Sequence, residues 1–286
     1  MRRGNGERGR KSPGDSIEET VAARLADASG AERRATVWRV AAWADVPSLR
    51  HGFLGRVHGL GPGAFDLATI RDRLAAAGET PDAVLAARQV HGADVLSPEH
   101  PAFAALDWQD GAARLPAADA LVTAAAGVFL TVRTADCVPV LLLAPAARAV
   151  AAVHAGWRGT LAGVVEHAVA ALGDRYGARP PTIQAAVGPA IGGCCYEFGV
   201  EHFAGFVARY GEEARRAWTP PGADPARGHL DVRTLVTLAL TRSGVDPGAI
   251  HLLGLCTAET PEALHSYRRD GAGAGRQLSY IGWQGA

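Results

Sequence analysis

The stretch A-V-A-A-V-H-A-G-W-R-G-T-L-A-G-V-V-E-H-A-V, from Ala149 to Val169, joins two kinds of secondary structure within a few residues. Its small apolar residues predict a buried strand that ends at His154. Gly156 and Gly159 allow a tight turn, and a helix is expected from Leu161 to Leu172, ended by the glycine that follows. Because ligands in α/β folds gather beyond strand ends, the stretch predicts an α/β domain with His154 beside a binding site.

Segments on both sides of this unit alternate between strand-like and helix-like patterns. The expected strands are V-W-R-V-A-A-W after Thr36, Ala83 to Val90, Ala120 to Val122, G-V-F-L-T-V-R from Gly127, V-P-V-L-L-L-A from Val138, Ile183 to Val187 and Ile250 to Leu255. The expected helices are Ile70 to Ala77, Val200 to Tyr210 and Val232 to Ser243. This alternation favours a single mixed α/β domain, and no internal repeat or linker divides it.

The first 35 residues differ in composition from the rest of the chain. Residues 1–16 are glycine, arginine and polar residues without periodicity, which predicts a disordered tail. A modest helical pattern follows from Ser16 to Ala28, but its apolar positions are mostly alanine. We therefore expect residues 1–35 to be a disordered or weakly ordered extension and residues 36–286 to be the folded domain.

Composition and charge exclude several classes of protein. Acidic and basic residues balance at 29 each, so no general attraction to nucleic acid or to a membrane surface is expected. No apolar run approaches the roughly 18 residues that cross a bilayer, and the basic start lacks the apolar stretch of a secretory signal. Four cysteines, two of them adjacent, do not form a disulfide framework. A cytoplasmic protein is the simplest interpretation.

Three residues share the predicted strand-end geometry: His91 in R-Q-V-H-G, Cys137 in R-T-A-D-C-V-P-V, and His154. Two histidines and one cysteine at one sheet edge suit zinc, and three protein ligands leave a position for water or substrate. A second interpretation needs no metal: Cys137 is a nucleophile with His154 as its base, oriented by Asp136 or another group. A third is that the cysteine is buried and structural.

Other candidate residues lie on glycine-rich loops. Arg158 would place a planar donor fork inside the H-A-G-W-R-G turn, suited to phosphate or carboxylate. The loop V-G-P-A-I-G-G-C-C-Y-E ends near Tyr196, and its alternative interpretation is a tight turn with two buried thiols. Near the end of the chain, Arg268 and Arg276 flank a glycine-rich segment, and arginines that converge there would bind an anion. Arg56 follows H-G-F-L-G early in the domain.

Taken together, these motifs resemble the laccase-domain family, which is also described as multicopper polyphenol oxidases and as purine nucleoside phosphorylases. In bacteria the family includes the peptidoglycan editing factor. The shared motifs run in family order from about His51 to Arg276: H-G-F-x-x-R, Q-V-H-G, T-A-D-C-x-P-V, H-A-G-W-R-G, G-P-x-I followed by C-Y-E, L-D-V, and S-Y-R-R-D with a later G-R.

The resemblance implies a layered α/β fold with a zinc site made by His91, Cys137 and His154. It also implies phosphorolysis of adenosine, inosine, guanosine and methylthioadenosine, together with hydrolytic deamination of adenosine. Copper fits less well than zinc, because a multicopper centre needs many more clustered histidines than the two matched here. In this interpretation the partners are a purine nucleoside and phosphate, and the sequence does not indicate an oligomeric state.

Under this resemblance the remaining candidates take specific roles. Asp136 would move protons during deamination, while Arg56, Arg158 and Arg268 would hold phosphate. Tyr196 and Arg276 would contribute to substrate binding.

One departure from the family pattern concerns the substrate side of the site. The segment after Arg56 is shortened, with His58-Gly59 in place of a glycine pair and Asp66 in place of an asparagine. A different substrate is one consequence that we expect. The alternatives are a cysteine-type amide hydrolase that edits peptidoglycan precursors, a polyphenol oxidase, and a non-enzymatic domain that binds a nucleotide or another anion.

Overall fold

The computed structural model describes residues 17–26, 32–62, 66–101, 115–222 and 224–285, and two stacked six-stranded sheets form its centre. The first sheet has the order β1 (Ile17–Ala26), β2 (Glu32–Val40), β3 (Leu49–Leu54), β15 (Gln277–Trp283), β7 (Val128–Thr134) and β4 (Ala83–Leu85). The second has the order β14 (Ile250–Leu252), β10 (Gln184–Val187), β8 (Val138–Ala144), β9 (Ala149–Ala155), β6 (Ala120–Thr123) and β5 (Val95–Leu96).

Strand β8 shows why the two sheets stack. Its sequence V-P-V-L-L-L-A is apolar throughout, and every residue of it is buried. Successive side chains of a strand point to opposite faces, so Val140 and Leu142 join the core beneath the helices, whereas Leu141 and Leu143 join the core between the sheets. A strand that is covered on both faces needs such a continuous apolar run.

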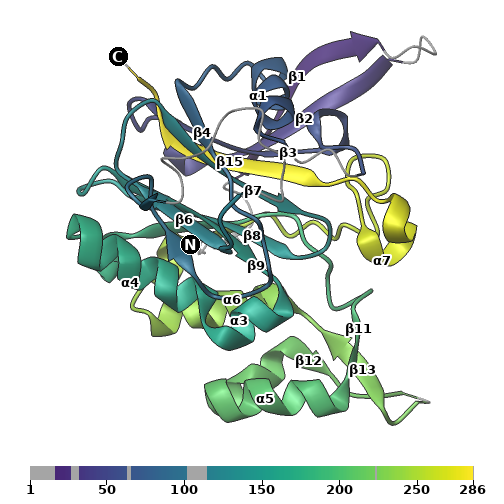
Figure 1. Ribbon diagram of the computed structural model, residues 1–286. Coiled ribbons are helices and arrows are strands. Elements are labelled where there is room, and N and C mark those ends of the chain that lie inside the picture. Colours follow the sequence, from purple (N-terminus) through teal and green to yellow (C-terminus); the bar gives the residue numbers. More distant parts are fainter. Residues whose placement is uncertain (1–16, 27–31, 63–65, 102–114, 223, 286) are drawn as a thin grey trace, which may run out of the picture.

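Helices cover the outer face of each sheet, which gives a four-layered molecule (Figure 1). The helices are α1 (Leu67–Ala76), α3 (Trp157–Ala162), α4 (Val164–Tyr176), α5 (Val200–Tyr210), α6 (Val232–Arg242) and α7 (Tyr267–Asp270). Helix α1 packs Ile70 and Leu74 on the first sheet, and α4 and α6 pack on the second. Helix α5 lies against a small third sheet with the order β11 (Glu197–Gly199), β13 (Arg227–Leu230) and β12 (Trp218–Thr219).

Most of the expected elements form, but several differ in type or length. Strand β2 ends at Val40 and β14 at Leu252, short of the expected Trp43 and Leu255. The helical pattern from Ser16 to Ala28 is wrong, because Ile17–Ala26 is strand β1, paired antiparallel with β2. The tail predicted for residues 1–16 lies outside the described residues, and the expected domain start at Thr36 falls inside β2. The strand from Ala83 to Val90 is shorter than expected, since β4 ends at Leu85 and a loop leads on to His91.

The helix expected from Leu161 to Leu172 is divided in two. Gly163 has a φ of 94°, a left-handed conformation that ends α3 and precedes α4. Helix α4 then continues past Gly173 to Tyr176, where Gly177 takes a φ of 68° as the C-terminal cap. The glycine that ends the helix is therefore Gly177 and not Gly173.

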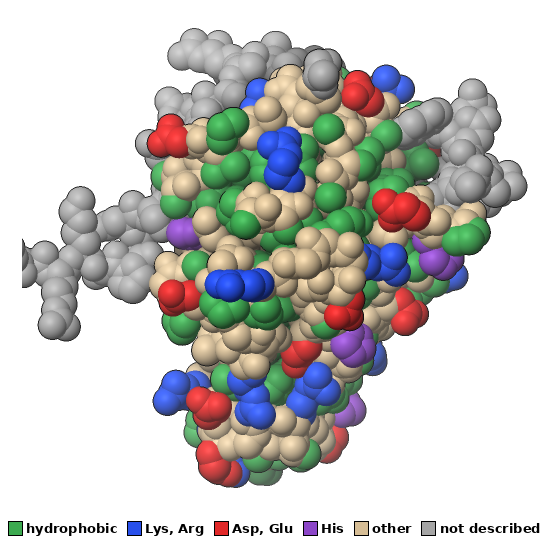
Figure 2. Space-filling view, turned by 90° about the vertical axis from the view of Figure 1, so that its left-hand side faces the viewer, with side chains coloured by type: hydrophobic (Ala, Val, Ile, Leu, Met, Phe, Trp, Pro, Cys, Tyr) green, Lys and Arg blue, Asp and Glu red, His purple; other side chains and the backbone are tan. Residues whose placement is uncertain are grey.

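The surface of the described residues agrees with a balanced charge. On the face in Figure 2, basic and acidic side chains are interspersed among apolar ones. Of the helices in the described ranges, none has the length and apolar character that crossing a bilayer requires.

Candidate functional site

Antiparallel strand pairing brings His154 next to Cys137. His154 is the next-to-last residue of β9 and pairs with Pro139, the second residue of β8, which lies two residues after Cys137. Cys137 lies, as expected, in the break between two strands, in the turn that leads from β7 of the first sheet to β8 of the second. The ligand atoms of His91, Cys137 and His154 lie within 4.8 Å of one another. The cluster expected from three separate motifs is therefore formed.

Asp119, which was not identified from the sequence, holds two of these three residues in place. Its Oδ1 accepts a hydrogen bond from Nδ1 of the buried His154 at 2.7 Å. The same carboxylate accepts the backbone N–H groups of Val90, His91 and Gly92 at 3.1, 3.0 and 2.7 Å. A carboxylate on one ring nitrogen turns the other nitrogen toward a metal, and such partners orient metal ligands. Its only signal in the sequence is an acidic residue directly before an apolar strand.

The loop that carries His91 is anchored at further points. The Gln89 amide donates to the Arg133 carbonyl at 2.7 Å and accepts the Arg133 N–H at 2.9 Å. His91 has a φ of 60°, a left-handed conformation that is uncommon for residues other than glycine. Such conformations persist where surrounding contacts enforce them, and they cluster at functional sites. Gln89 thus has a structural role in the Q-V-H-G motif.

The electrostatics of the cluster favour a thiolate. Burial raises the pKa of the Cys137 thiol, but His154 and His91 outweigh burial and lower that pKa to about 6. Burial lowers the pKa of His154, but Cys137 and Asp119 outweigh it and raise that pKa to about 9. The pair therefore favours a thiolate beside an imidazolium. A thiolate is the form of cysteine that binds metals and that acts as a nucleophile.

The residues of the cluster fit a zinc ion. Two imidazoles and one thiolate are zinc ligands, and three of them leave an open coordination position. The backbone passes close to the cluster at Gly156, where a Cβ atom would lie 2.9 Å from Cδ2 of His91 and 3.0 Å from Sγ of Cys137. Only glycine leaves room for the cluster at this position, which gives the G in H-A-G-W-R-G a structural reason.

The cluster opens into a cavity of about 590 Å³. Five arginines line it: Arg88, Arg133, Arg158, Arg268 and Arg276. The guanidinium of Arg158 lies over the ring of its neighbour Trp157, 4.4 Å from the centroid. Arg268 lies over Tyr196 at 5.0 Å and donates to the Glu197 carbonyl at 3.2 Å. The cavity therefore combines positive charge with aromatic surface.

Two tyrosines line the same cavity. Burial, with Cys137 and Asp136 nearby, raises the pKa of Tyr196 to about 12, so its hydroxyl stays protonated at neutral pH. Tyr267 is 55% exposed, and Arg276 lies 6.0 Å from its ring centroid. Tyr267 and Arg88 were not identified as site residues from the sequence, although they lie within the motifs S-Y-R-R-D and R-Q-V-H-G.

Asp136 and Arg56, two predicted site residues, make contacts that differ from those expected. Asp136 lines the cavity, but its Oδ1 accepts from the Thr257 hydroxyl and its Oδ2 from the Arg268 N–H, both at 2.6 Å. These contacts favour a positioning role for Asp136 over proton transfer. Arg56 is not among the described residues that line the cavity, and its Nη1 donates to the Pro261 carbonyl at 2.9 Å.

Known proteins resemble this chain over most of its length. The family model for multi-copper polyphenol oxidoreductase laccases matches residues 64–284. A purine nucleoside phosphorylase of Xylella fastidiosa is 38% identical over 196 residues, which cover 68% of this chain and 71% of that protein. A purine nucleoside phosphorylase of Streptomyces coelicolor is 40% identical over 231 residues, which cover 80% of this chain and 86% of that protein.

Two solved structures confirm the mixed α/β fold. YlmD from Geobacillus stearothermophilus superposes with a TM-score of 0.75 at 28% identity, covering 87% of this chain and 96% of that one. The hypothetical protein YfiH from Bacillus licheniformis superposes with a TM-score of 0.73 at 25% identity, with the same coverage of both chains.

Proposed function

This chain belongs to the multi-copper polyphenol oxidoreductase laccase family, and we propose that it is a zinc-dependent purine nucleoside phosphorylase. Its relatives named purine nucleoside phosphorylase support an enzyme that acts on small molecules. The proposed substrates are adenosine, inosine, guanosine and methylthioadenosine, each with phosphate. The observation that carries the proposal is the cluster of His91, Cys137 and His154 in the wall of a cavity lined by arginines.

The arginines supply the phosphate-binding part of the proposal. Arg158 and Arg268 present planar donor groups at the cavity, and such groups match the oxygens of phosphate. Phosphate held there would attack C1′ of the sugar while the glycosidic bond breaks and its electron pair leaves with the purine. The products are the free base and a pentose 1-phosphate. Arg56 has no part in this proposal, because its side chain bonds to Pro261 instead.

The tyrosines supply the base-binding part. Aromatic surfaces stack on purine rings, and Tyr267 and Tyr196 both line the cavity. The protonated Tyr196 hydroxyl can donate a hydrogen bond to the departing purine. Arg276 lines the cavity beside Tyr267 and completes the substrate side.

Zinc is the proposed ion of the histidine–cysteine cluster. Lewis-acid chemistry is what zinc supplies at a site with an open coordination position. His91, Cys137 and His154 would hold it, and Asp119 would keep the His154 ring oriented. Copper is the weaker candidate, because the cluster contains two histidines, fewer than a multicopper centre needs. The proposal includes deamination of adenosine, in which water replaces the amino group of the purine.

A second candidate function rests on the same residues without metal. In this alternative Cys137 is the thiolate nucleophile, His154 is its base, and Asp119 is the carboxylate that orients the base. Such a triad would cleave an amide or ester, including that of a peptidoglycan precursor. Activity that survives complete metal removal but is lost on thiol alkylation would favour this hydrolase.

The decisive experiment combines product analysis with two variants and a control. Purified protein with measured zinc content is given adenosine with and without phosphate, and adenine, pentose 1-phosphate and ammonia are quantified. We expect phosphate-dependent adenine release, its loss in Cys137→Ala, and a KM for phosphate raised about tenfold or more in Arg158→Ala. Arg215→Ala is the matched control, because Arg215 is exposed and pairs with Glu212 at 2.6 Å.

Two outcomes would contradict this scheme. If Arg158→Ala left phosphorolysis unchanged while Cys137→Ala abolished it, the phosphate role of Arg158 would be wrong. If the zinc-loaded protein released no base from any of the proposed nucleosides, the phosphorylase itself would be wrong.

A further inference from the structure

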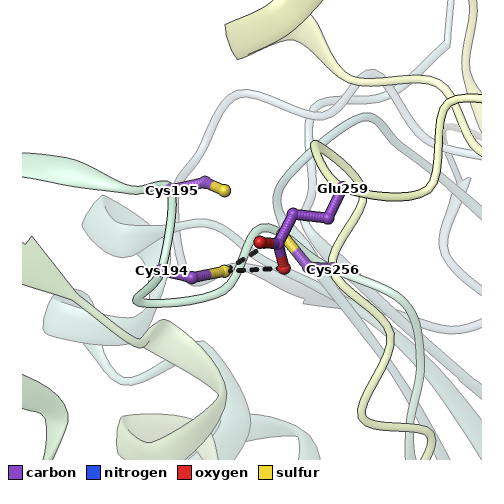
Figure 3. A group of neighbouring side chains, drawn as sticks. All are labelled: Cys194, Cys195, Cys256 and Glu259. Carbon is purple, nitrogen blue, oxygen red and sulfur yellow. Dashed lines mark hydrogen bonds between the residues drawn. The ribbon is translucent and has the colours of Figure 1, made fainter.

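A second group of metal-ligating side chains lies outside the cavity. Its four ligand atoms lie within 4.8 Å of one another and come from Cys194, Cys195, Cys256 and Glu259. Within the described part of the chain, the residues that line the cavity include none of these four. Figure 3 shows the sulfur of Cys256 and the carboxylate of Glu259 beside the sulfur of Cys194. We propose a second, structural metal site, with zinc as its ion, formed by Cys194, Cys195, Cys256 and Glu259.

The distance between two sulfurs supports this assignment. Sγ of Cys194 lies 3.6 Å from Sγ of Cys256. Two thiolates bound at about 2.3 Å to one tetrahedral zinc lie about 3.8 Å apart, so the observed separation matches shared coordination. A disulfide would need a separation of about 2.05 Å. An Oε2–Sγ distance of 3.1 Å between Glu259 and Cys194 places the carboxylate beside the same sulfur.

Backbone pairing holds the two ligand segments together. The segments 190–192 and 255–257 are joined by a parallel bridge between Ala190 and Cys256 and by the Thr257 N–H bond to the Ala190 carbonyl at 3.1 Å. The Gly192 N–H also points at Sγ of Cys256, at 3.3 Å. An N–H donor at a sulfur favours its thiolate, the form that binds metal. The ligands are thus preorganised on two paired loops, with a Cys-x-x-Glu spacing in the second.

The charges around the group favour a cation. Three thiols and a carboxylate repel one another as they ionise, and a bound cation removes that repulsion. The guanidinium of Arg233 lies nearby, but it is paired with Asp231 at 2.9 Å. Three thiolates select a soft ion, and the carboxylate favours zinc over Cu(I). Zinc binding would release the thiol protons to solvent as the Zn–S bonds form.

Four protein ligands make this a closed site, which is typical of structural zinc. Its loops reach the cavity through neighbouring residues, because Tyr196 follows Cys195 and lines the cavity, and Thr257 follows Cys256 and bonds Asp136. The ion would therefore hold together the two loops that carry Tyr196 and Thr257. It would take no part in the chemistry.

The test is metal binding by the full chain, with variants that separate the two sites. Elemental analysis of reduced protein, loaded with zinc and freed of excess, should give about two ions per chain. Cys194→Ser and Glu259→Gln should each bind the second ion at least about tenfold more weakly in competition with a chelator. Both replaced residues are exposed, so the core is not disturbed, and Glu262→Gln is the matched control because it is exposed and outside the group.

Cobalt provides a readout that is independent of nucleoside turnover. In Cys137→Ser the first cluster has no thiolate, so strong thiolate-to-Co²⁺ absorption should come from the second site and decrease when Cys194→Ser is added, because two of its three cysteines remain. Zinc content and affinity in Cys194→Ser and Glu259→Gln equal to those of the unchanged protein would overturn the proposal. A Cys194–Cys256 disulfide in place of metal, detected by thiol counting and mass spectrometry, would also overturn it. Either result leaves the proposed phosphorylase untouched, because that function depends on Cys137.

Discussion

The cluster around Cys137 and the cluster around Cys194 both gather their ligand atoms within 4.8 Å, yet their surroundings differ. The first contains the buried His154, is oriented by Asp119, and opens into the cavity. The second consists of three thiols and a carboxylate, lies on paired loops, and has two exposed members. Three ligands beside a cavity leave a position for chemistry, whereas four ligands without one close the coordination shell. The number of ligands and the access to the cavity, more than the presence of cysteine, separate the proposed catalytic site from the proposed structural one.

The largest effect should come from removing the thiolate of the first cluster. In Cys137→Ser we expect nucleoside turnover to fall by at least about a thousandfold, because the proposed site loses its ion and with it the Lewis acid. The second cluster should keep its zinc, so metal content should fall by about one ion per chain. The measurement is kcat/KM for adenosine with phosphate, alongside elemental analysis. Turnover that persisted in the variant would remove the distinction between the two clusters.

A smaller loss is expected when the orientation of the first cluster is disturbed. Asp119→Asn weakens the hydrogen bonds to Nδ1–H of His154 and to the backbone N–H groups of the His91 loop. Loss of such a supporting partner typically costs about 10- to 100-fold in metal affinity or activity. Chelator competition would measure the affinity, with the exposed Asp94→Asn as the matched control. Equal affinities in the two variants would mean that Asp119 only stabilises the fold.

Acid releases metal from any cluster of thiolates and imidazoles. To separate metal loss from acid unfolding of the protein itself, a group that lies outside both clusters is needed. His51 is such a group, because Nε2 of this buried side chain accepts the Val40 N–H at 2.9 Å and its ring packs edge-on against Trp43. Burial, with a contribution from Arg39, lowers the pKa of His51 from 6.5 to about 3.

The unfolded chain therefore binds this proton more readily than the folded one, and the folded state loses stability as the pH falls from 6.5 toward 3. At pH 5 the loss should be about 2 kcal/mol relative to pH 7. Urea unfolding of metal-free protein at several pH values measures it. His51→Gln keeps an acceptor for Val40 and should flatten the profile. An unchanged slope in that variant would show that other groups control acid unfolding.

The smallest effect on turnover should come from the second cluster. Cys194→Ser should leave kcat/KM within about twofold of the unchanged protein, because its exposed sulfur lies outside the cavity and the Ala190–Cys256 bridge still joins the two loops. Steady-state kinetics with adenosine and phosphate measure this. A large loss of kcat without loss of folding, seen by circular dichroism, would place the second cluster in the chemistry and end the contrast between the two.

The sequence alone was sufficient for much of the fold and for the first cluster. The continuous apolar run of β8 predicts a strand covered on both faces, and helix α5 has the bounds expected from its periodicity, Val200–Tyr210. The motifs around His91, Cys137 and His154 pointed to three candidate ligands that the structure brings together, because each motif is a short segment that contains its own glycine or proline turn. Such local patterns are visible along the chain.

What the sequence did not show are the contacts that join distant segments. Asp119 lies 35 residues from His154 and Cys256 lies 62 from Cys194, and neither separation follows a local pattern. The side chain of Arg56 bonds to Pro261 instead of lining the cavity, although its motif matches the family. The physical reason is strand pairing. Antiparallel pairing places the end of β9 beside the start of β8, and the parallel bridge between Ala190 and Cys256 brings the two segments of the second cluster together. Local composition determined which residues could bind metal, and the tertiary structure decided which of them meet.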